Sequence, residues 1–464
     1  MKRPMEHNSC EPEWTLFGEA PAPVPEVGTS GGVGGVAAEE HPYFKKRIFA
    51  DEPLKDALDE YVPTACDLLM AEGRAASALL LEAAKAFDAG HLDQCAKAAA
   101  QCVAAAWHLL QKSPTEAVLH AHALSHAMLA ATEADEQKAM LHADLSLSLC
   151  PDLPIAAVHT VMKLCNERCQ NVLPILEDGL AWEIPSMLPA TAKTPEVQKP
   201  IIRKPCSHLS VMGFRDAFLK TQQPGVIEGH LLSAGWSTAR WSDLRFWAGR
   251  HGHRTIPIEM GFHENDAQSI ALQHSDSEGS MRLGDFVRRF LLPSNTVLKN
   301  GFVRSSEAID EWSASPVAYM AQHQLLLQIP ELRRDILIPQ YCALGELQTV
   351  NVWIGTAGTV TALHYDLDDN FLVQVSGYKY LRLYSPAEGE RLYARDAPRD
   401  RQKKHGASYS PVRVEHPDLE VHPDFAHAAF VETILGPGDM LFIPRRWWHY
   451  VRSLTTSISV NFWF

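Results

Sequence analysis

Hydrophobic and polar positions follow a helical period over much of the first half of the chain. In the run AASALLLEAAKAF at 75–87, apolar side chains recur at spacings of three and four residues. Gly90, the Ser113–Pro114 pair and Pro151 interrupt this pattern. The spacing predicts five or six antiparallel helices between about 51 and 182. We assign residues 46–182 to an α-helical domain.

Two segments show neither the helical spacing nor the strand-like alternation of apolar residues. Residues 1–45 are rich in glycine and proline, and no Gly-Lys-Ser/Thr follows the glycine run, so they are predicted to be a flexible leader rather than a phosphate-binding loop. Residues 183–205 contain repeated prolines and few large apolar side chains, which is typical of a linker.

From residue 206 onward the pattern changes to short apolar runs bounded by turn residues. Two short helices are expected near 241–249 and 281–291. Many short strands in a segment of this length predict a closed antiparallel barrel or jelly roll, and with the helical domain an α+β fold. The strands are expected at 224–228, 254–259, 348–354, 371–375, 379–384, 440–443 and 457–463.

Composition narrows the classes of function. Lys and Arg number 42 against 56 Asp and Glu, a net charge of −14, so we expect no strong direct binding to nucleic acid. The nine cysteines are scattered and odd in number, which favours a reducing compartment inside the cell, nucleus or cytoplasm. The N-terminus has no apolar core of a secretory signal, and no run is long enough to cross a bilayer, so no membrane association is expected.

A candidate metal site stands out in the second half. His364 and Asp366 are two residues apart, so on a strand both side chains point to one face. His449 is the candidate third ligand, and two imidazoles with one carboxylate are the ligand set of non-haem Fe(II) oxygenases. Other His-x-Asp pairs fall in predicted helices or polar loops. The alternative for His449 is a core histidine packed against Trp447 and Trp448.

Lys379 begins a predicted strand shortly after this pair. An ammonium group directed into an apolar barrel requires an anion, and a dicarboxylate co-substrate would supply one. Thr361 and Asn370 would add neutral hydrogen-bond partners on neighbouring inward positions. The alternative for Lys379 is a solvent-exposed lysine at a strand edge.

Four stretches carry a resemblance to a known family. They are WIGTAGTVT at 353–361, LHYDLDDN at 363–370, FLVQVSGYKYLRLYSP at 371–386 and PGDMLFIPRRWWHYV at 437–451. With them, residues 206–464 resemble the JmjC-domain 2-oxoglutarate/Fe(II) oxygenases. The tract YMAQHQLLLQIPEL at 319–332 and the ending SVNFWF fit a subgroup of small JmjC proteins. The resemblance implies a double-stranded β-helix, the cupin-like jelly roll.

The resemblance also implies roles for individual residues. His364, Asp366 and His449 would ligate Fe(II), and Lys379 would bind the distal carboxylate of 2-oxoglutarate. The remaining implied residues are Tyr319, Thr361 and Asn370 around the co-substrate, Trp353 and Trp463 in the pocket wall, and Glu259 and Gln322 on the substrate side. The chain departs from the subgroup after Glu259 and in a longer, more basic loop at 399–405.

By this resemblance the protein consumes O2 and 2-oxoglutarate, releases succinate and CO2, and hydroxylates a protein side chain, with arginine favoured. Acidic residues such as Asp368 and Asp369 suit a protein or peptide substrate with a basic side chain, histones among the candidates. Demethylation of histone N-methyl-lysine by the same chemistry is the alternative. A third reading is a JmjC-like binding scaffold without turnover, and the helical domain is a candidate surface for a protein partner.

Overall fold

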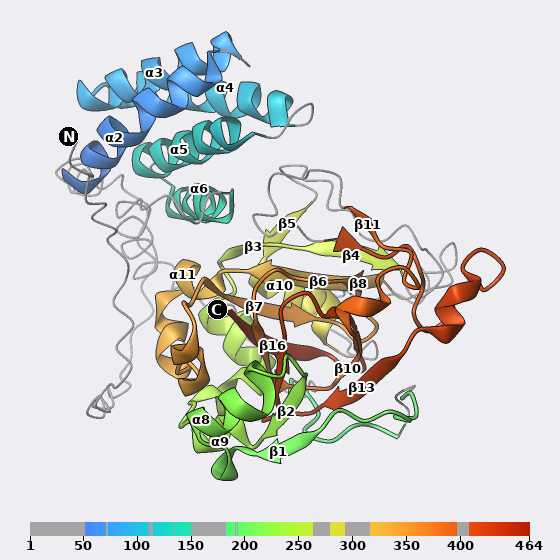
Figure 1. Ribbon diagram of the computed structural model, residues 1–464. Helices are drawn as coiled ribbons and strands as arrows, with labels where there is room; N and C mark the ends of the chain where they lie inside the picture. The colour runs from blue at the N-terminus through green and yellow to red at the C-terminus, as the bar shows by residue number, and fades with distance from the viewer. Residues whose placement is uncertain are drawn as a thin grey trace, which may run out of the picture.

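A computed structural model describes residues 52–70, 73–110, 115–133, 135–149, 182–190, 192, 194–262, 279–292, 316–396 and 408–464. The predicted leader at 1–45, residues 150–181 of the predicted helical domain, most of the stretch after Glu259 and the loop at 399–405 lie outside them. The described residues form a helical bundle beside a two-sheet jelly roll (Figure 1). None of the described helices is both long and apolar enough to span a membrane.

The bundle follows the predicted helical period. On α3, the buried side chains include Ala76, Leu80, Ala83 and Phe87, which form a single stripe along the helix. These alanines bring neighbouring helices close together around a core shared by the whole bundle. Among the described residues, its helices are α2 (Glu52–Leu69), α3 (Arg74–Asp88), α4 (Leu92–Leu110), α5 (Glu116–Thr132) and α6 (Glu136–Leu149).

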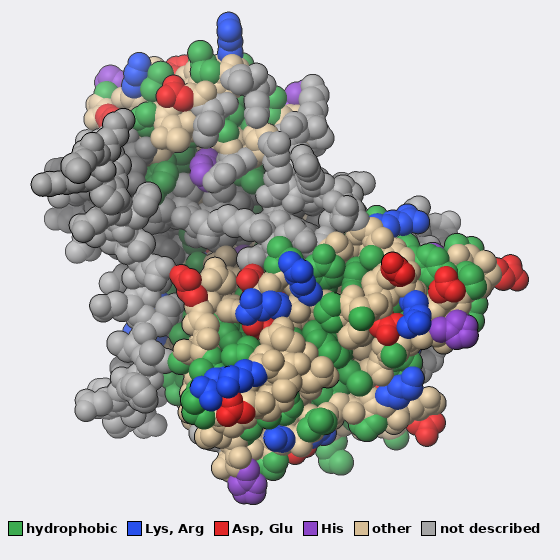
Figure 2. Space-filling view, viewed as in Figure 1, with side chains coloured by type: hydrophobic (Ala, Val, Ile, Leu, Met, Phe, Trp, Pro, Cys, Tyr) green, Lys and Arg blue, Asp and Glu red, His purple; other side chains and the backbone are tan. Residues whose placement is uncertain are grey.

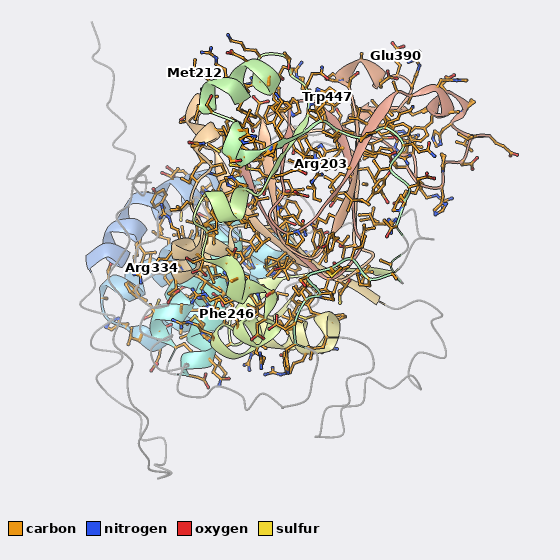
Figure 3. All side chains as sticks on the ribbon, turned by 90° about the horizontal axis from the view of Figure 1, so that it is seen from below. Arg203, Met212, Phe246, Arg334, Glu390 and Trp447 are labelled. Atoms are coloured by element: carbon orange, nitrogen blue, oxygen red, sulfur yellow. The ribbon has the colours of Figure 1, made fainter. Side chains whose placement is uncertain are left out.

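In the described part of the chain, the larger sheet of the jelly roll has eight strands. In spatial order they are β1 (Arg203–Pro205), β2 (Gly225–Glu228), β14 (Met440–Ile443), β9 (Asn370–Ser376), β16 (Ser457–Trp463), β7 (Thr349–Gly355), β6 (Pro316–His323) and β4 (Glu259–Phe262). All its pairs are antiparallel except β1 with β2, which is parallel. Arg203 on β1 donates to Glu228 and Asp439 and so fastens this edge (Figure 3).

The second sheet has six strands among the described residues, and His364, Lys379 and His449 lie on three of them. In order they are β11 (Arg395–Asp396), β12 (Ser408–Tyr409), β8 (Val360–His364), β15 (Trp448–Ser453), β10 (Lys379–Tyr384) and β13 (Phe430–Leu435). A separate antiparallel pair joins β3 (Thr255–Pro257) to β5 (Ser280–Arg282). The strand predicted at 254–259 is therefore divided between β3 and β4, because the register with β5 ends at Pro257 and the register with β6 begins at Glu259.

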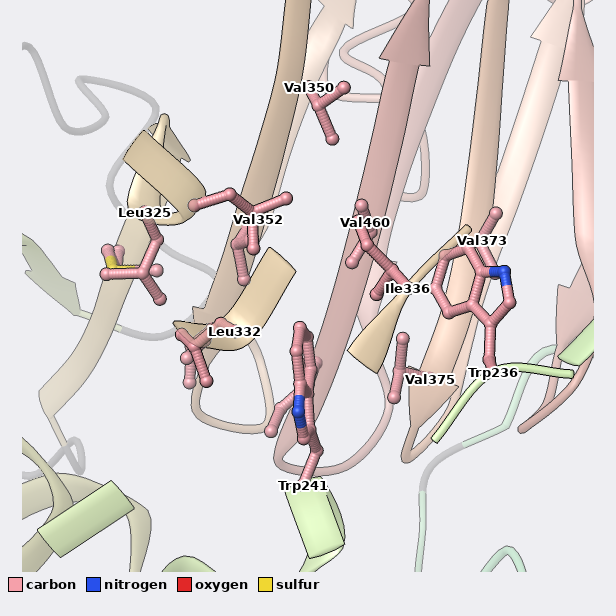
Figure 4. Close-up of a cluster of buried hydrophobic side chains, with 14 of the residues drawn as sticks. Trp236, Trp241, Leu325, Leu332, Ile336, Val350, Val352, Val373, Val375 and Val460 are labelled. Atoms are coloured by element: carbon pink, nitrogen blue, oxygen red, sulfur yellow. The ribbon is translucent and has the colours of Figure 1, made fainter. Parts of the chain in front are cut away.

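Alternation along the strands separates an apolar core on the outer face of the larger sheet from an interior between the sheets that holds both apolar and polar side chains. On β16, Ile458, Val460 and Phe462 point toward the short helices and pack in the largest apolar cluster. The intervening Ser459 and Asn461 are buried on the opposite face, between the sheets. Figure 4 shows this cluster where Trp236 and Trp241 approach Val352, Val373 and Val460.

Short helical segments cover the outer face of the larger sheet. The helix expected near 241–249 is present as η4 (Thr238–Ser242) and η5 (Phe246–Arg250), and that near 281–291 as α10 (Leu283–Phe286) and η6 (Val287–Leu291). Residues of the predicted linker run over the jelly roll, with Ile184 and Ile201 in its cores. The domain boundaries themselves stay a prediction.

Candidate metal centre and co-substrate pocket

Two histidines face each other on neighbouring strands. His364 is the last residue of β8 and His449 is the second residue of β15. The two residues are direct partners in the strand register, so their side chains lie on the same face. Their ring centroids are 4.2 Å apart, and this face is the interior of the jelly roll.

Asp366 joins the two histidines from a turn and not from the strand. The sequence places it on the same strand as His364, but β8 ends at His364. Alternate residues on a regular strand are about 6.6 Å apart, so leaving the strand allows a closer approach of the two side chains. The carboxylate oxygens lie 3.8 Å from Nε2 of His364 and 3.7 Å from Nε2 of His449.

Backbone carbonyls orient the two histidines, and a tryptophan side chain orients Asp366. Nδ1 of His364 donates to the carbonyl of Ala362 at 2.8 Å, and Nδ1 of His449 donates to the carbonyl of Trp447 at 3.0 Å. With the proton on Nδ1, the lone pair of each ring is on Nε2, the atom that faces Asp366. Trp463 Nε1 donates to the Asp366 carboxylate at 3.2 Å and fixes its orientation.

This group fits a divalent transition metal. Each side chain offers one ligand atom, and the three atoms lie within 4.8 Å of one another. It is the single such group of three or more found among the residues that the structure describes. Neutral imidazoles and one carboxylate with an open side match the ligand set of a non-haem iron. The core-histidine alternative for His449 does not account for this convergence.

Lys379 lies in the same interior. It begins β10, and in the register with β15 it shares a face with His449. Its side chain is 2% exposed, and its ammonium contacts the hydroxyl of Tyr319 at 3.3 Å. Burial lowers the pKa of Lys379 to about 7. The lysine is therefore interior rather than at a solvent-exposed edge, and its position suits an anionic ligand.

The predicted residues share one narrow cavity of about 50 Å³. All of them line it except Glu259, which lies on β4 opposite Tyr319. Four further residues of the wall were not predicted from the sequence, namely Leu372, Ile443, Val451 and Asn461. Strand alternation could have identified three of these, because Leu372, Val451 and Asn461 are each two residues from a predicted member.

Asn461 connects two predicted pocket residues. Its side-chain oxygen accepts a hydrogen bond from Trp353 Nε1 at 2.8 Å, and its amide donates to Asn370 at 3.2 Å. Trp353 in turn packs against the ring of Tyr319, with centroids 5.7 Å apart. These contacts hold the neutral polar groups of the wall in fixed positions.

Asp368 and Asp369, which were expected at the mouth of the pocket, interact with Arg445 instead. Asp369 is 1% exposed and accepts hydrogen bonds from the guanidinium and the backbone of Arg445. Asp368 is half-buried, and its charge also acts on Arg445. Glu259 lies nearer the pocket, where its negative charge adds to burial in raising the pKa of Tyr319.

Comparison with known proteins agrees with this geometry. The model of the Cupin-like domain family matches residues 212–464. The chain is 40% identical over 263 residues to lysine-specific demethylase 8 of Xenopus tropicalis, covering 55% of this chain and 51% of that protein. It is 36% identical over 260 residues to lysine-specific demethylase JMJ30 of Arabidopsis thaliana, covering 55% and 53%. It is also 36% identical over 137 residues to tRNA wybutosine-synthesizing protein 5 of Danio rerio, covering 29% and 39%.

The jelly roll and its His–Asp–His group define a class of protein, the cupin-like metal-binding fold. The chain belongs to the Cupin-like domain family, and its jelly roll is of the JmjC type. The matches span about half the length of the curated relatives named above as demethylases. The family implies Fe(II) and 2-oxoglutarate, and the residues of the pocket fit both.

Proposed function

We propose that this protein is an Fe(II)- and 2-oxoglutarate-dependent oxygenase that hydroxylates a protein side chain, with arginine favoured. The observation that carries the proposal is the convergence of the His364–Asp366–His449 group and the Lys379 ammonium on one cavity. A scaffold without turnover would have no need for a buried ammonium beside a metal-binding group. The relatives' names support the same class of chemistry.

We assign metal binding to one end of the cavity and binding of the co-substrate carboxylate to the other. His364, Asp366 and His449 would hold Fe(II), which supplies the redox chemistry that couples decarboxylation of 2-oxoglutarate to oxygen insertion. Lys379 would bind the distal carboxylate, with Tyr319, Thr361 and Asn370 completing its hydrogen bonds. Trp353 and Trp463 would exclude water. Both histidines ligate only when neutral, so metal affinity should fall in acid.

Glu259 and Gln322 are the proposed contacts of the substrate. Gln322 lines the cavity, and Glu259 is half-buried on the neighbouring strand. A carboxylate at this position would bind a guanidinium through paired hydrogen bonds. The names of two relatives, both lysine-specific demethylases, favour a second candidate, oxidation of an N-methyl group on lysine. Histones are candidate substrates for this reaction as well.

We also propose that the protein acts inside the cell, in the nucleus or cytoplasm, since five described cysteines are free thiols. On the face drawn in Figure 2, described Lys and Arg side chains are interspersed with Asp and Glu. This mixture on the drawn face of the jelly roll is unlike the continuous basic patch that nucleic-acid binding requires. We propose the helical domain as a surface for a protein partner.

The test is succinate release from 2-oxoglutarate in the presence of Fe(II) and ascorbate. The wild-type chain should turn over with a suitable peptide, and His364→Ala should lose more than about 100-fold in rate because a metal ligand is missing. Mass spectrometry of the peptide separates the outcomes, since hydroxylation adds one oxygen atom and demethylation removes a methyl group. Equal rates in both proteins would contradict the proposal.

A further inference from the structure

A buried ion pair joins the helical bundle to the jelly roll. Asp144 lies on α6 and Arg254 directly precedes β3, and both side chains are fully buried. Nη2 of Arg254 donates to Asp144 at 2.6 Å, and the other carboxylate oxygen accepts the backbone N–H of Thr255 at 2.7 Å. Figure 1 shows α6 as the helix of the bundle beside β3. Because neither charge reaches water, separating the pair would be costly, so it fixes α6 against β3.

A second contact supports this arrangement. Arg282 on β5 donates to the side chain of Gln137 on α6 at 3.0 Å. This bond is exposed and therefore contributes little energy by itself. It places α6 against the β3–β5 pair at a second point, seven residues before Asp144.

Hydrogen bonds continue from the ion pair to the strand β6. Arg254 Nη2 also donates to the backbone carbonyl of Gln328 at 2.7 Å. The Gln328 amide donates to the carbonyl of Thr255 at 2.6 Å, which directs its Oε1 toward His323. Nε2 of His323 then donates to that oxygen at 2.6 Å. The series links α6 to the last residue of β6.

His323 ends a bulge in the wall of the cavity. Met320 pairs with Ile354 and His323 pairs with Val352, so two residues of β6 stand opposite one residue of β7. One of the two is Gln322, whose φ of 44° lies in the left-handed region. Side chains other than glycine rarely adopt this conformation, so surrounding contacts must hold it. Gln322 and Tyr319 on this strand both line the cavity.

We propose that Asp144 of the helical bundle is a positioning residue for the co-substrate pocket, acting through Arg254, Gln328 and His323 on the bulge of β6. The choice of 2-oxoglutarate as the ligand in the test rests on the proposed function. The positioning of β6 by Asp144 does not depend on that function. Tyr319 contacts Lys379, so displacement of β6 should weaken binding of a dicarboxylate. The metal ligands lie on or just after β8 and β15 in the other sheet, so metal affinity should be unchanged.

The experiment uses the full chain with Asp144→Asn, which keeps the shape of the side chain and removes its charge. Mn(II) affinity is measured by electron paramagnetic resonance, and 2-oxoglutarate affinity by calorimetry with Mn(II) present. Hydrogen exchange of the amides at 316–323 reports on β6 without any ligand. We expect about a 10- to 100-fold loss of 2-oxoglutarate affinity, unchanged Mn(II) affinity and faster exchange in β6.

Two further variants separate positioning from stability. Ser146→Ala is the matched control, because Ser146 lies on the same helix and bonds only within the bundle, to Ala123. It should leave both affinities and β6 exchange at wild-type values. Asp144→Leu/Arg254→Met removes both charges, so it should melt at a higher temperature than Asp144→Leu. It should not recover 2-oxoglutarate affinity, since the hydrogen bonds to Thr255 and Gln328 are still missing.

The outcomes are distinguishable. A lower melting temperature in Asp144→Asn with wild-type 2-oxoglutarate affinity and β6 exchange overturns the inference. Loss of metal and dicarboxylate affinity in equal proportion also overturns it, because that indicates general loosening. If the wild-type chain binds Mn(II) but no 2-oxoglutarate, the proposed function fails. Hydrogen exchange in β6 then still decides whether Asp144 acts on the pocket wall.

Discussion

Lys379 is the residue whose chemistry depends most on its surroundings. No ion pair to a carboxylate holds it among the described residues, and its polar contact is the hydroxyl of Tyr319. Burial lowers its pKa from 10.5 to about 7. Between about pH 7 and pH 10.5, Lys379 is protonated in the unfolded chain and deprotonated in the folded chain. The stability of the ligand-free protein should therefore rise with pH across this window.

Binding of a dicarboxylate has the opposite dependence on pH. The bound anion requires the charged ammonium, so above about pH 7 binding must take up a proton. We predict that 2-oxoglutarate affinity falls by up to roughly ten-fold per pH unit above this value. Calorimetry with Mn(II) in two buffers of different ionisation enthalpy measures the proton uptake.

Lys379→Arg is the matched variant for this prediction. A guanidinium stays charged throughout, so the variant should bind more weakly but with a flat profile above pH 7. A profile as steep as that of the wild type would show that another group titrates.

At the scale of elements, tight turns bring the functional strands together. Gly377 lies between β9 and β10 with φ of 74°, and a Cβ there would stand 2.1 Å from the carbonyl of Thr456. Without this close approach, β10 could not enter its sheet at Lys379. Gly438 also has a positive φ, of 95°, but a Cβ on it would meet no atom within 4 Å.

These two glycines give a matched pair of substitutions. Gly438→Ala should lose only the cost of the left-handed backbone, about 1 kcal/mol of unfolding free energy. Gly377→Ala adds a backbone collision and should lose clearly more, about 3 kcal/mol or above. Urea denaturation followed by tryptophan fluorescence measures both. An equal loss in the two variants would show that the turn at Gly377 relaxes without cost.

At the scale of the whole molecule, ligands should stabilise the fold through the interior between the sheets. Metal and 2-oxoglutarate should bind only the native chain, so at one hundred times its dissociation constant each ligand should add about 2.7 kcal/mol to the free energy of unfolding. For a domain of this size that corresponds to a rise in melting temperature of roughly 5–10 °C. Calorimetry with Mn(II) and 2-oxoglutarate, then with a chelator, measures the rise and its reversal. An undiminished rise in His364→Ala would argue against the site.

Much of the architecture was predictable from local pattern. The strands at 379–384, 440–443 and 457–463 agree with β10, β14 and β16, because alternation and turn residues mark their ends. The strand β6 was not predicted, although the tract from Tyr319 was singled out for its resemblance. From Val317 to Met320 its side chains are all buried and apolar or aromatic, so they show no alternation, and the bulge at Gln322 interrupts the period beyond them.

The sequence by itself determined the composition of the site: two histidines, an aspartate and a lysine in segments of strand character. Only the tertiary structure decided that Asp366 leaves β8 to meet both imidazoles, that Arg445 engages Asp369, and that Asp144 is buried against Arg254. The physical reason is the distance along the chain between the residues that determine each feature. Strand and helix periods are set by neighbours along the chain, whereas these three contacts join segments that approach each other only when the sheets and the bundle have packed.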